Sequence, residues 1–270
     1  MVELTRQDKP VSFKDICLSA DEIKTRQIGL VDLRECLVKG FRDYSENPMA
    51  SVPFIALFYF ICALVVSVGS FGQELRYFAF PLVAGFTLLG PIVAIAFFEM
   101  SRRREQGLET RWLAAFDFIH SASFAPILAL SILMAALYVF WLYMAEMIYF
   151  GLFGTELPVS MDAFLNQLVN TREGLLLIAY GNFVGFLFAF AALAISVVSF
   201  PLALDKPVTS LTAISVSVRA AFSNMGVIIV WGIIVAVLLA LGAALALVGL
   251  AVALPVLGHA TWHLYKKLVV

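Results

Sequence analysis

Residues 225–265 read MGVIIVWGIIVAVLLALGAALALVGLAVALPVLGHATWHLY, and this stretch decides the fold. A helix crosses the roughly 30 Å of a bilayer core in about 20 residues, because each residue adds about 1.5 Å. A straight helix of these 41 residues would reach about 60 Å, twice that thickness. The stretch therefore predicts a membrane hairpin with its turn near Ala246–Leu250, where Gly249 eases the reversal. One long span followed by an interfacial helix is the alternative.

The rest of the chain also has the composition of a membrane protein. Of its 270 residues 62% are hydrophobic and 14% are charged, and the mean hydropathy is +0.95. A soluble domain has about 45–50% apolar and about 25% charged residues. Four further stretches are long enough to span a bilayer: Met49–Phe71, Tyr77–Phe98, Ala125–Phe150 and Leu175–Phe200. The sequence thus predicts an all-α polytopic membrane helix bundle of about six transmembrane helices.

The positions of the basic residues predict its orientation. With both termini in the cytoplasm, 16 of the 18 Lys and Arg residues fall on the inner side, and only Arg76 and Arg172 fall outside. Such an excess of inner positive charge is the usual signature of membrane topology. The first 48 residues hold no apolar core of a secretory signal, so we expect no cleaved leader. Aromatic residues near the outer end of the third span suggest an interfacial belt: Tyr138, Trp141, Tyr143 and Tyr149.

An amphipathic stretch precedes each pair of spans on the cytoplasmic side. Apolar residues recur at helical spacing in three sets: Leu30, Leu33, Leu37, Phe41 and Tyr44; Leu108, Trp112, Phe116 and Ile119; and Leu211, Ile214, Val218 and Phe222. We interpret these as three interfacial helices, each followed by a membrane hairpin. The predicted organisation is a polar cytoplasmic tail over residues 1–27 and a single membrane domain over residues 28–270, with hairpin units 28–98, 105–200 and 207–270.

His259 and His263 are the strongest candidates for metal ligands. Their spacing of four places both imidazoles on one helical face near the inner end of the last span. A third ligand would have to come from elsewhere, and His120 and Glu99 are the only obvious donors on that side. The pair also suits anchoring at the headgroup level, so we expect no metal and no cofactor.

The other polar candidates lie within spans. Glu146 is the carboxylate furthest inside a long apolar stretch, near its outer end, and an ionisable group in a span is by default a functional suspect. Asn182 lies within Gly181–Gly185, a GxxxG groove extended by Ala189, where another helix can approach closely. The groove suits packing within the chain, and also contact with another copy or another membrane subunit.

Several function classes are disfavoured. The sequence has no Walker P-loop, GxSxG elbow, HExxH motif or paired catalytic carboxylates, so we expect no enzyme. The net charge of −1 gives no basic field for nucleic acid, which leaves the lipid bilayer as the certain partner.

Two runs carry a family resemblance: PLVAGFTLLGPIVAIAFFEMSRRREQG (Pro81–Gly107) and LPVLGHATWHLYKKLV (Leu254–Val269). They resemble an uncharacterised domain-of-unknown-function family of bacterial multi-span inner-membrane proteins, over residues 28–270. Some members are labelled as a cytochrome c oxidase subunit. The resemblance implies the bacterial inner membrane and an accessory or assembly role in a respiratory complex. The alternative is a small-solute or lipid transporter built from the repeated hairpins, with a crevice lined by Asn182, Tyr180 and Glu146.

Overall fold

The computed structural model describes residues 17–270 except 57–58, 61–78, 156–157, 159 and 246–247. The described residues are helical apart from loops and one isolated β-bridge between Thr25 and Val269. The helices, with η marking 3-10 helices, are α2 (Leu30–Glu46), η1 (Pro48–Ser51), α4 (Ala79–Phe86), η3 (Thr87–Leu89), α5 (Gly90–Glu105), η4 (Trp112–His120), α6 (Phe124–Phe153), α7 (Met161–Asn170), α8 (Arg172–Asp205), α9 (Ser210–Ser223), α10 (Met225–Ala244) and α11 (Leu250–Leu268).

Four described segments are long and apolar enough to cross a bilayer, which confirms the predicted polytopic membrane helix bundle. They are Phe80–Glu105, α6, α8 and α10. The expected span Met49–Phe71 lies mostly outside the described residues. The expected sixth span corresponds to α11, which at 19 residues is long enough but is not apolar enough to be a candidate span.

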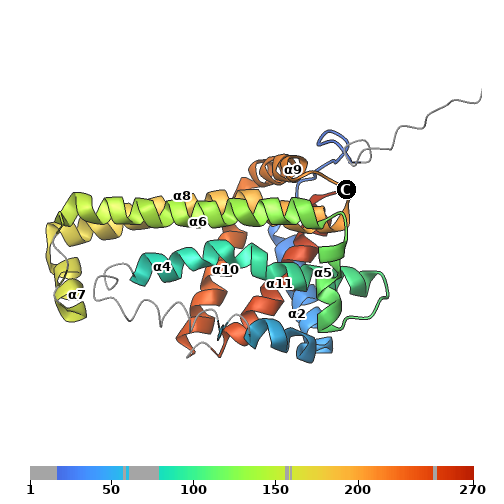
Figure 1. Ribbon diagram of the computed structural model, residues 1–270, viewed down its shortest axis with the longest axis horizontal. Helices are drawn as coiled ribbons and strands as arrows, with labels where there is room; N and C mark the ends of the chain where they lie inside the picture. Colours follow the sequence, from blue (N-terminus) through green and yellow to red (C-terminus); the bar gives the residue numbers. More distant parts are fainter. Residues whose placement is uncertain (1–16, 57–58, 61–78, 156–157, 159, 246–247) are drawn as a thin grey trace, which may run out of the picture.

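The long helices α6 and α8 lie side by side, and the α4–α5 segment runs along them (Figure 1). Trp141 of α6 lies at the centre of this layer. A Cβ on Gly85 would come within 2.3 Å of the Trp141 ring, and one on Gly185 would come within 3.2 Å, so both glycines make room for the indole. The Trp141 Nε1–H donates to the carbonyl of Pro81 at 2.8 Å. Trp141 is therefore a buried packing residue, and the belt interpretation is wrong for it.

Helix α9 packs against α8, and the buried hydroxyl of Ser217 on α9 hydrogen-bonds to the backbone of α8. Ser217 Oγ donates to the carbonyl of Ala194 at 2.7 Å and accepts from the Val198 N–H at 3.1 Å. Those two backbone groups are four residues apart, so the hydroxyl sits between a carbonyl and the amide that would normally bond to it in an α-helix. Pro201, three residues further on, cannot donate to the carbonyl of the preceding turn, which also loosens α8 here.

Helices α10 and α11 are separate helices joined by a turn, and both run at a steep angle to the α6–α8 pair (Figure 1). Only α10 is a candidate span, so this arrangement fits both the predicted membrane hairpin and its alternative of one span followed by an interfacial helix. Helix α10 ends at Ala244 and α11 begins at Leu250, which confirms the expected position of the turn. The two glycines at the turn touch, because a Cβ on Gly249 would lie 2.7 Å from the Cα of Gly242. Any larger residue at either position would force the two helices apart.

The main partner of α2 is α11, at the opposite end of the chain. Gly40 allows this contact, since a Cβ there would lie 2.6 Å from the backbone nitrogen of Ala260. The buried face of α2 is Leu33, Cys36 and Gly40, whereas Leu30 and Phe41 of the predicted apolar stripe are exposed. The first amphipathic helix therefore packs through a narrower, smaller-residue face than its sequence pattern suggested.

The segment before α2 is held against the bundle. The Val270 N–H donates to the carbonyl of Lys24 and the Arg26 N–H donates to the carbonyl of Leu268, both at 3.0 Å. Arg219 of α9 donates to the carbonyls of Ala20 and Ile23, at 2.8 Å and 2.5 Å. Within the expected tail of residues 1–27, the stretch from about residue 18 is thus part of the packed structure.

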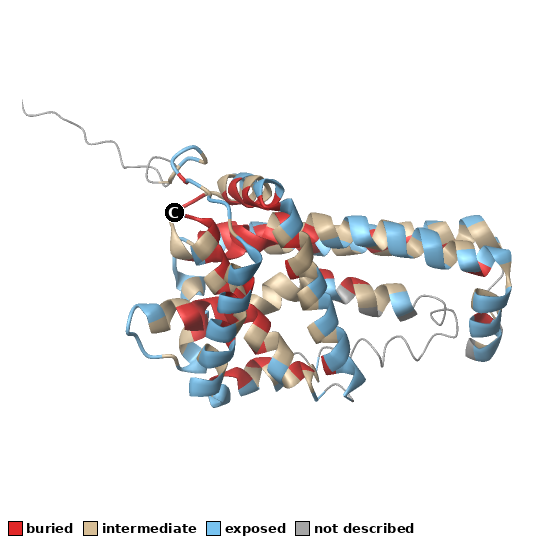
Figure 2. Cartoon of the chain, turned by 180° about the vertical axis from the view of Figure 1, so that it is seen from behind, coloured by how far each residue is buried: buried red, intermediate tan, exposed pale blue. Residues whose placement is uncertain are grey.

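The core lies at one end of the molecule, where the buried residues of Figure 2 gather. The C-terminal ends of α5, α8 and α11 meet there with α2 and α9: Ser101 contacts His259, and Asp205 contacts Tyr265. The predicted topology places these three ends together, because α5, α8 and α11 correspond to the second, fourth and sixth expected spans, which all end on the same side of the membrane. The far halves of α6 and α8 are largely exposed within the chain.

Candidate functional site

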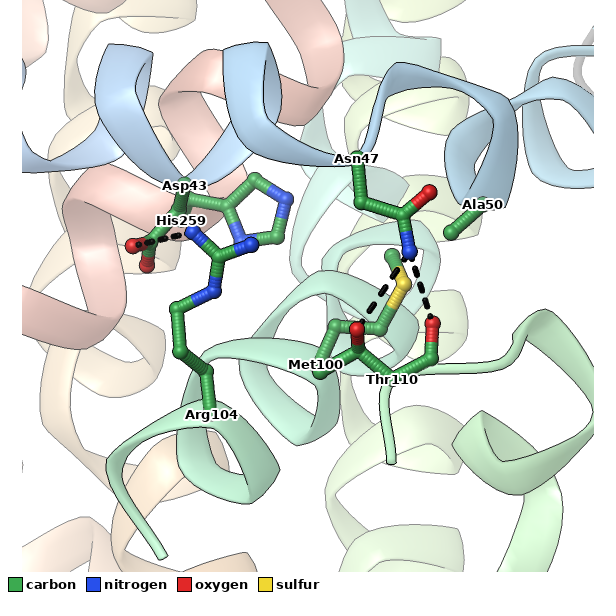
Figure 3. Close-up of a pocket in the computed structure, with 7 residues that line it drawn as sticks. All are labelled: Asp43, Asn47, Ala50, Met100, Arg104, Thr110 and His259. Carbon is green, nitrogen blue, oxygen red and sulfur yellow. Dashed lines mark hydrogen bonds and ion pairs between the residues drawn. The ribbon is translucent and has the colours of Figure 1, made fainter. Parts of the chain in front are cut away.

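A cluster of polar side chains joins α2, α5 and α11, and we call Asp43, Ser101, Arg104, His259 and His263 the polar hub. Asp43 Oδ2 accepts a hydrogen bond from Ser101 Oγ at 2.6 Å and one from His263 Nε2 at 2.9 Å. Ser101 Oγ also lies 2.8 Å from His259 Nδ1. Because the single hydroxyl hydrogen points to Asp43, His259 is the donor in that second contact. Figure 3 shows Asp43, Arg104 and His259 converging from the three helices.

Two close helix contacts bring these residues together. Gly40 lets α2 lie against α11, which places Asp43 one turn further along, opposite the two histidines. Gly258 does the same for α5, since a Cβ there would lie 2.7 Å from atoms of Phe97. Ser101, four residues after Phe97, then faces His259 on the neighbouring turn of α11.

The hub is electrostatically balanced around Asp43. Burial alone would raise the pKa of Asp43, but the hydrogen bonds from His263 and Ser101 outweigh it and hold this pKa below the ordinary aspartate value. Arg104 Nη1 lies 3.4 Å from Asp43 Oδ1 and 2.7 Å from Glu46 Oε2. Asp43 is therefore an ionised acceptor whose negative charge is matched by donors from two other helices.

The space beside the hub is small. A cavity of about 10 Å³ is lined by Asp43, Asn47, Ala50, Met100, Arg104, Thr110 and His259 (Figure 3). Such a volume holds roughly one water molecule. Its outer wall is fixed by Asn47 Nδ2, which donates to the carbonyl of Thr110 at 3.2 Å. The hub can hold water and exchange protons, but an organic substrate does not fit in this cavity.

The other two candidate metal donors lie apart from the histidine pair. The Glu99 side chain is fully buried and accepts two hydrogen bonds from Arg102, at 2.7 Å and 2.9 Å, with Arg103 at 3.5 Å. His120 is exposed at the end of η4. Within the ranges that the structure describes, no three His, Cys, Asp or Glu side chains converge as a metal site would require.

The C-terminal end of α11 makes a further hydrogen bond and further ion pairs that no sequence pattern had indicated. Tyr265 Oη donates to Asp205 at 2.7 Å, which ties α11 to the end of α8. Lys267 Nζ lies 2.5 Å from Asp32 and 2.6 Å from Glu35, which ties it to α2. These partners are separated from α11 by 60 to 235 residues, so only the folded chain reveals them.

The predicted groove on α8 divides into two parts. Gly185 packs against Trp141, whereas a Cβ on Gly181 would meet nothing within 4 Å, and Ala189 is exposed. Asn182 lies on the exposed side of α8, and its Nδ2 donates to the carbonyl of Ile178 at 2.7 Å. The groove thus serves packing within the chain at one position and stays open at another.

The crevice expected for a transporter gains no support. Tyr180 is exposed on α8 as Asn182 is, and Glu146 is half-buried on α6. Two of the three residues therefore face outward from the bundle rather than toward an internal space.

Fold and hub together define a polytopic α-helical integral membrane protein in which α2, α5 and α11 are joined at one end by hydrogen bonds and an ion pair. Residues 79–205, just under half of the chain, match the model of a family described as predicted integral membrane protein (DUF2189). The match includes the first of the two runs that carry the resemblance and stops before the second. Comparisons with curated proteins and with solved structures give no match.

Proposed function

We propose that this chain is a non-catalytic component of a larger membrane assembly, and that it binds another transmembrane helix through the outer face of α8. The observation that carries the proposal is the position of Asn182, which is exposed on a candidate span beside the open Gly181. A carboxamide has two donor hydrogens and an acceptor oxygen, and the bond to Ile178 uses one donor.

The environment of a span makes this position informative. The hydrocarbon core supplies no hydrogen-bond partners, and an unsatisfied polar group there costs several kcal/mol. Asparagine in a span commonly bonds across a helix–helix contact, and small neighbours let the two backbones approach. A second helix against Gly181 and Asn182 would supply the missing partner.

The class of partner follows from the resemblance. An accessory or assembly role in a respiratory complex of the cytochrome c oxidase type is the first hypothesis to test, in the bacterial inner membrane with both chain ends cytoplasmic. The distribution of basic residues supports that orientation. The meeting of the ends of α5, α8 and α11 supports their placement on one common side. The balanced, nearly filled hub supports a structural rather than a catalytic role.

The test is purification from its own membranes in mild detergent, at native expression, followed by mass spectrometry of the subunits that co-purify. We expect other membrane subunits with the wild type and their loss with Asn182→Leu, which removes the amide but keeps the span apolar. Leu187→Ala, also on the exposed side of α8, is the matched control and should keep them. Recovery of the wild-type chain alone would refute the assembly role.

A further inference from the structure

The short helix η4 presents a row of large apolar side chains to its surroundings. In a 3-10 helix, residues three apart lie directly above one another. Leu113, Phe116 and Ile119 have this spacing and are 60%, 40% and 40% exposed; we call them the η4 row. Ala115 is buried. The sequence pattern had predicted an interfacial helix here with the stripe Leu108, Trp112, Phe116 and Ile119, and the 3-10 geometry replaces that stripe by the η4 row.

A second side of η4, next to the row, makes an ion pair with α5. Asp117 accepts a hydrogen bond from Arg103 Nη1 at 2.9 Å, and Arg103 also donates to the carbonyl of Glu109 at 2.9 Å. This anchoring holds η4 in one orientation against the end of α5. These contacts help to hold η4 in place while the η4 row faces outward.

Further exposed apolar residues follow η4 along the chain, at the start of α6. Phe124, Leu128 and Ile132 follow at steps of four and are all exposed on the first turns of this candidate span. The exposed face of a span meets acyl chains, and Trp112, immediately before the η4 row, is the kind of residue enriched where acyl chains give way to headgroups. Because the chain passes from η4 directly into the exposed apolar residues of a candidate span, lipid is the occupant that the neighbouring segment favours.

We propose that η4 is an interfacial element of the membrane domain, with the η4 row inserted among the lipid acyl chains and Trp112 at the headgroup boundary. Phospholipid is thus the partner of this surface. A short helix inserted in this way binds through its buried apolar area. It would also fix the depth at which the ends of α5 and α6 sit in the bilayer.

The tryptophans of the chain allow a direct test. Of its four tryptophans, Trp112 is 42% exposed, whereas Trp141, Trp231 and Trp262 are 5% exposed or less. The protein is placed in nanodiscs whose phospholipids carry bromine, a short-range quencher of tryptophan fluorescence, at either a shallow or a deep acyl position. The Trp112→Phe variant, which keeps an apolar ring, supplies the background of the other three indoles.

The wild-type-minus-variant signal should be quenched severalfold more by the shallow bromine than by the deep one, and little by aqueous iodide. Strong iodide quenching without bromolipid quenching would show that η4 faces water and would overturn the proposal. Resistance to both quenchers would show that protein covers the η4 row, either another copy or another subunit, and would overturn it too.

Discussion

Asp43 is the acceptor that α5 and α11 share, and its carboxylate is nearly buried. We predict that Asp43→Asn lowers stability by roughly 2–4 kcal/mol, because it leaves His263 and Arg104 facing a neutral amide inside the hub. Thermal unfolding in detergent should show the loss. Glu46 is a half-exposed partner of the same Arg104, so Glu46→Gln should lower stability by less than about 1 kcal/mol. Equal losses in the two variants would show that the buried position of Asp43 adds nothing to stability.

The same residue predicts an acid sensitivity. The pKa of Asp43 is lowered by folding, so its contribution is fully present above the ordinary aspartate value of 3.8 and is lost as the pH falls through the lower folded value. The unfolding temperature of the wild type should therefore fall below about pH 4. Asp43→Asn should remove part of that slope; parallel pH profiles for the two proteins would show that other titratable groups are responsible.

At the scale of the elements, the close contact of α2 with α11 requires glycine at position 40, because a Cβ there would clash with α11. Alanine is normally about 1 kcal/mol better than glycine within a helix. Gly40→Ala should nevertheless be destabilising by roughly 2 kcal/mol or more, because its Cβ would press on backbone atoms of α11, which cannot rotate away. Gly181→Ala, in open space on α8, should leave the thermal stability of the isolated chain unchanged or slightly higher.

The link between α8 and α9 gives a second test at this scale. Ser217→Ala removes a buried hydroxyl that bonds both Ala194 and Val198, and we expect a loss of roughly 1–2 kcal/mol. Ser215, two residues earlier on α9, is exposed, and its replacement by alanine should change stability by less than about 0.5 kcal/mol. A loss of the same size in both variants would mean that α9 merely tolerates serine poorly.

At the scale of the whole molecule, we predict which side of the membrane each loop faces, and cysteine labelling tests it. A cysteine introduced at Thr155, just past the end of α6, should react with an impermeant thiol reagent in intact cells, whereas Cys17 should not, because 16 of 18 basic residues favour the other face as cytoplasmic. Labelling after permeabilisation confirms that each thiol is reactive. Reaction of Cys17 in sealed cells would reverse the orientation.

Hydropathy and length were enough to predict most of the bundle. Long apolar runs predicted α6, α8 and α10. Residues 225–265 are twice as long as one span needs, and this length predicted the turn between α10 and α11. The break between α4 and α5 and the 3-10 geometry of η4 were not predicted, because apolar patterns at these lengths fit several helix types.

The sequence indicated the two histidines of the hub but not the residues that contact them. The spacing of His259 and His263 singled them out, but their partners Asp43 and Ser101 lie 220 and 158 residues away and belong to no motif. What brings them together is backbone proximity at Gly40 and Gly258. Glycines of this kind look the same in a sequence as glycines facing lipid.

The pairing of α2 with α11 also sets a schedule for making the protein. Helix α2 leaves the ribosome well before α11, because the other long helices lie between them in the sequence, so the main docking surface of α2 is synthesised much later than α2 itself. Until then the face of Leu33, Cys36 and Gly40 has no α11 to cover it, and residues 18–28 lack the strand-like partner at Val269. A nascent chain stalled before residue 250 would therefore display an unfinished surface that quality-control proteases can recognise.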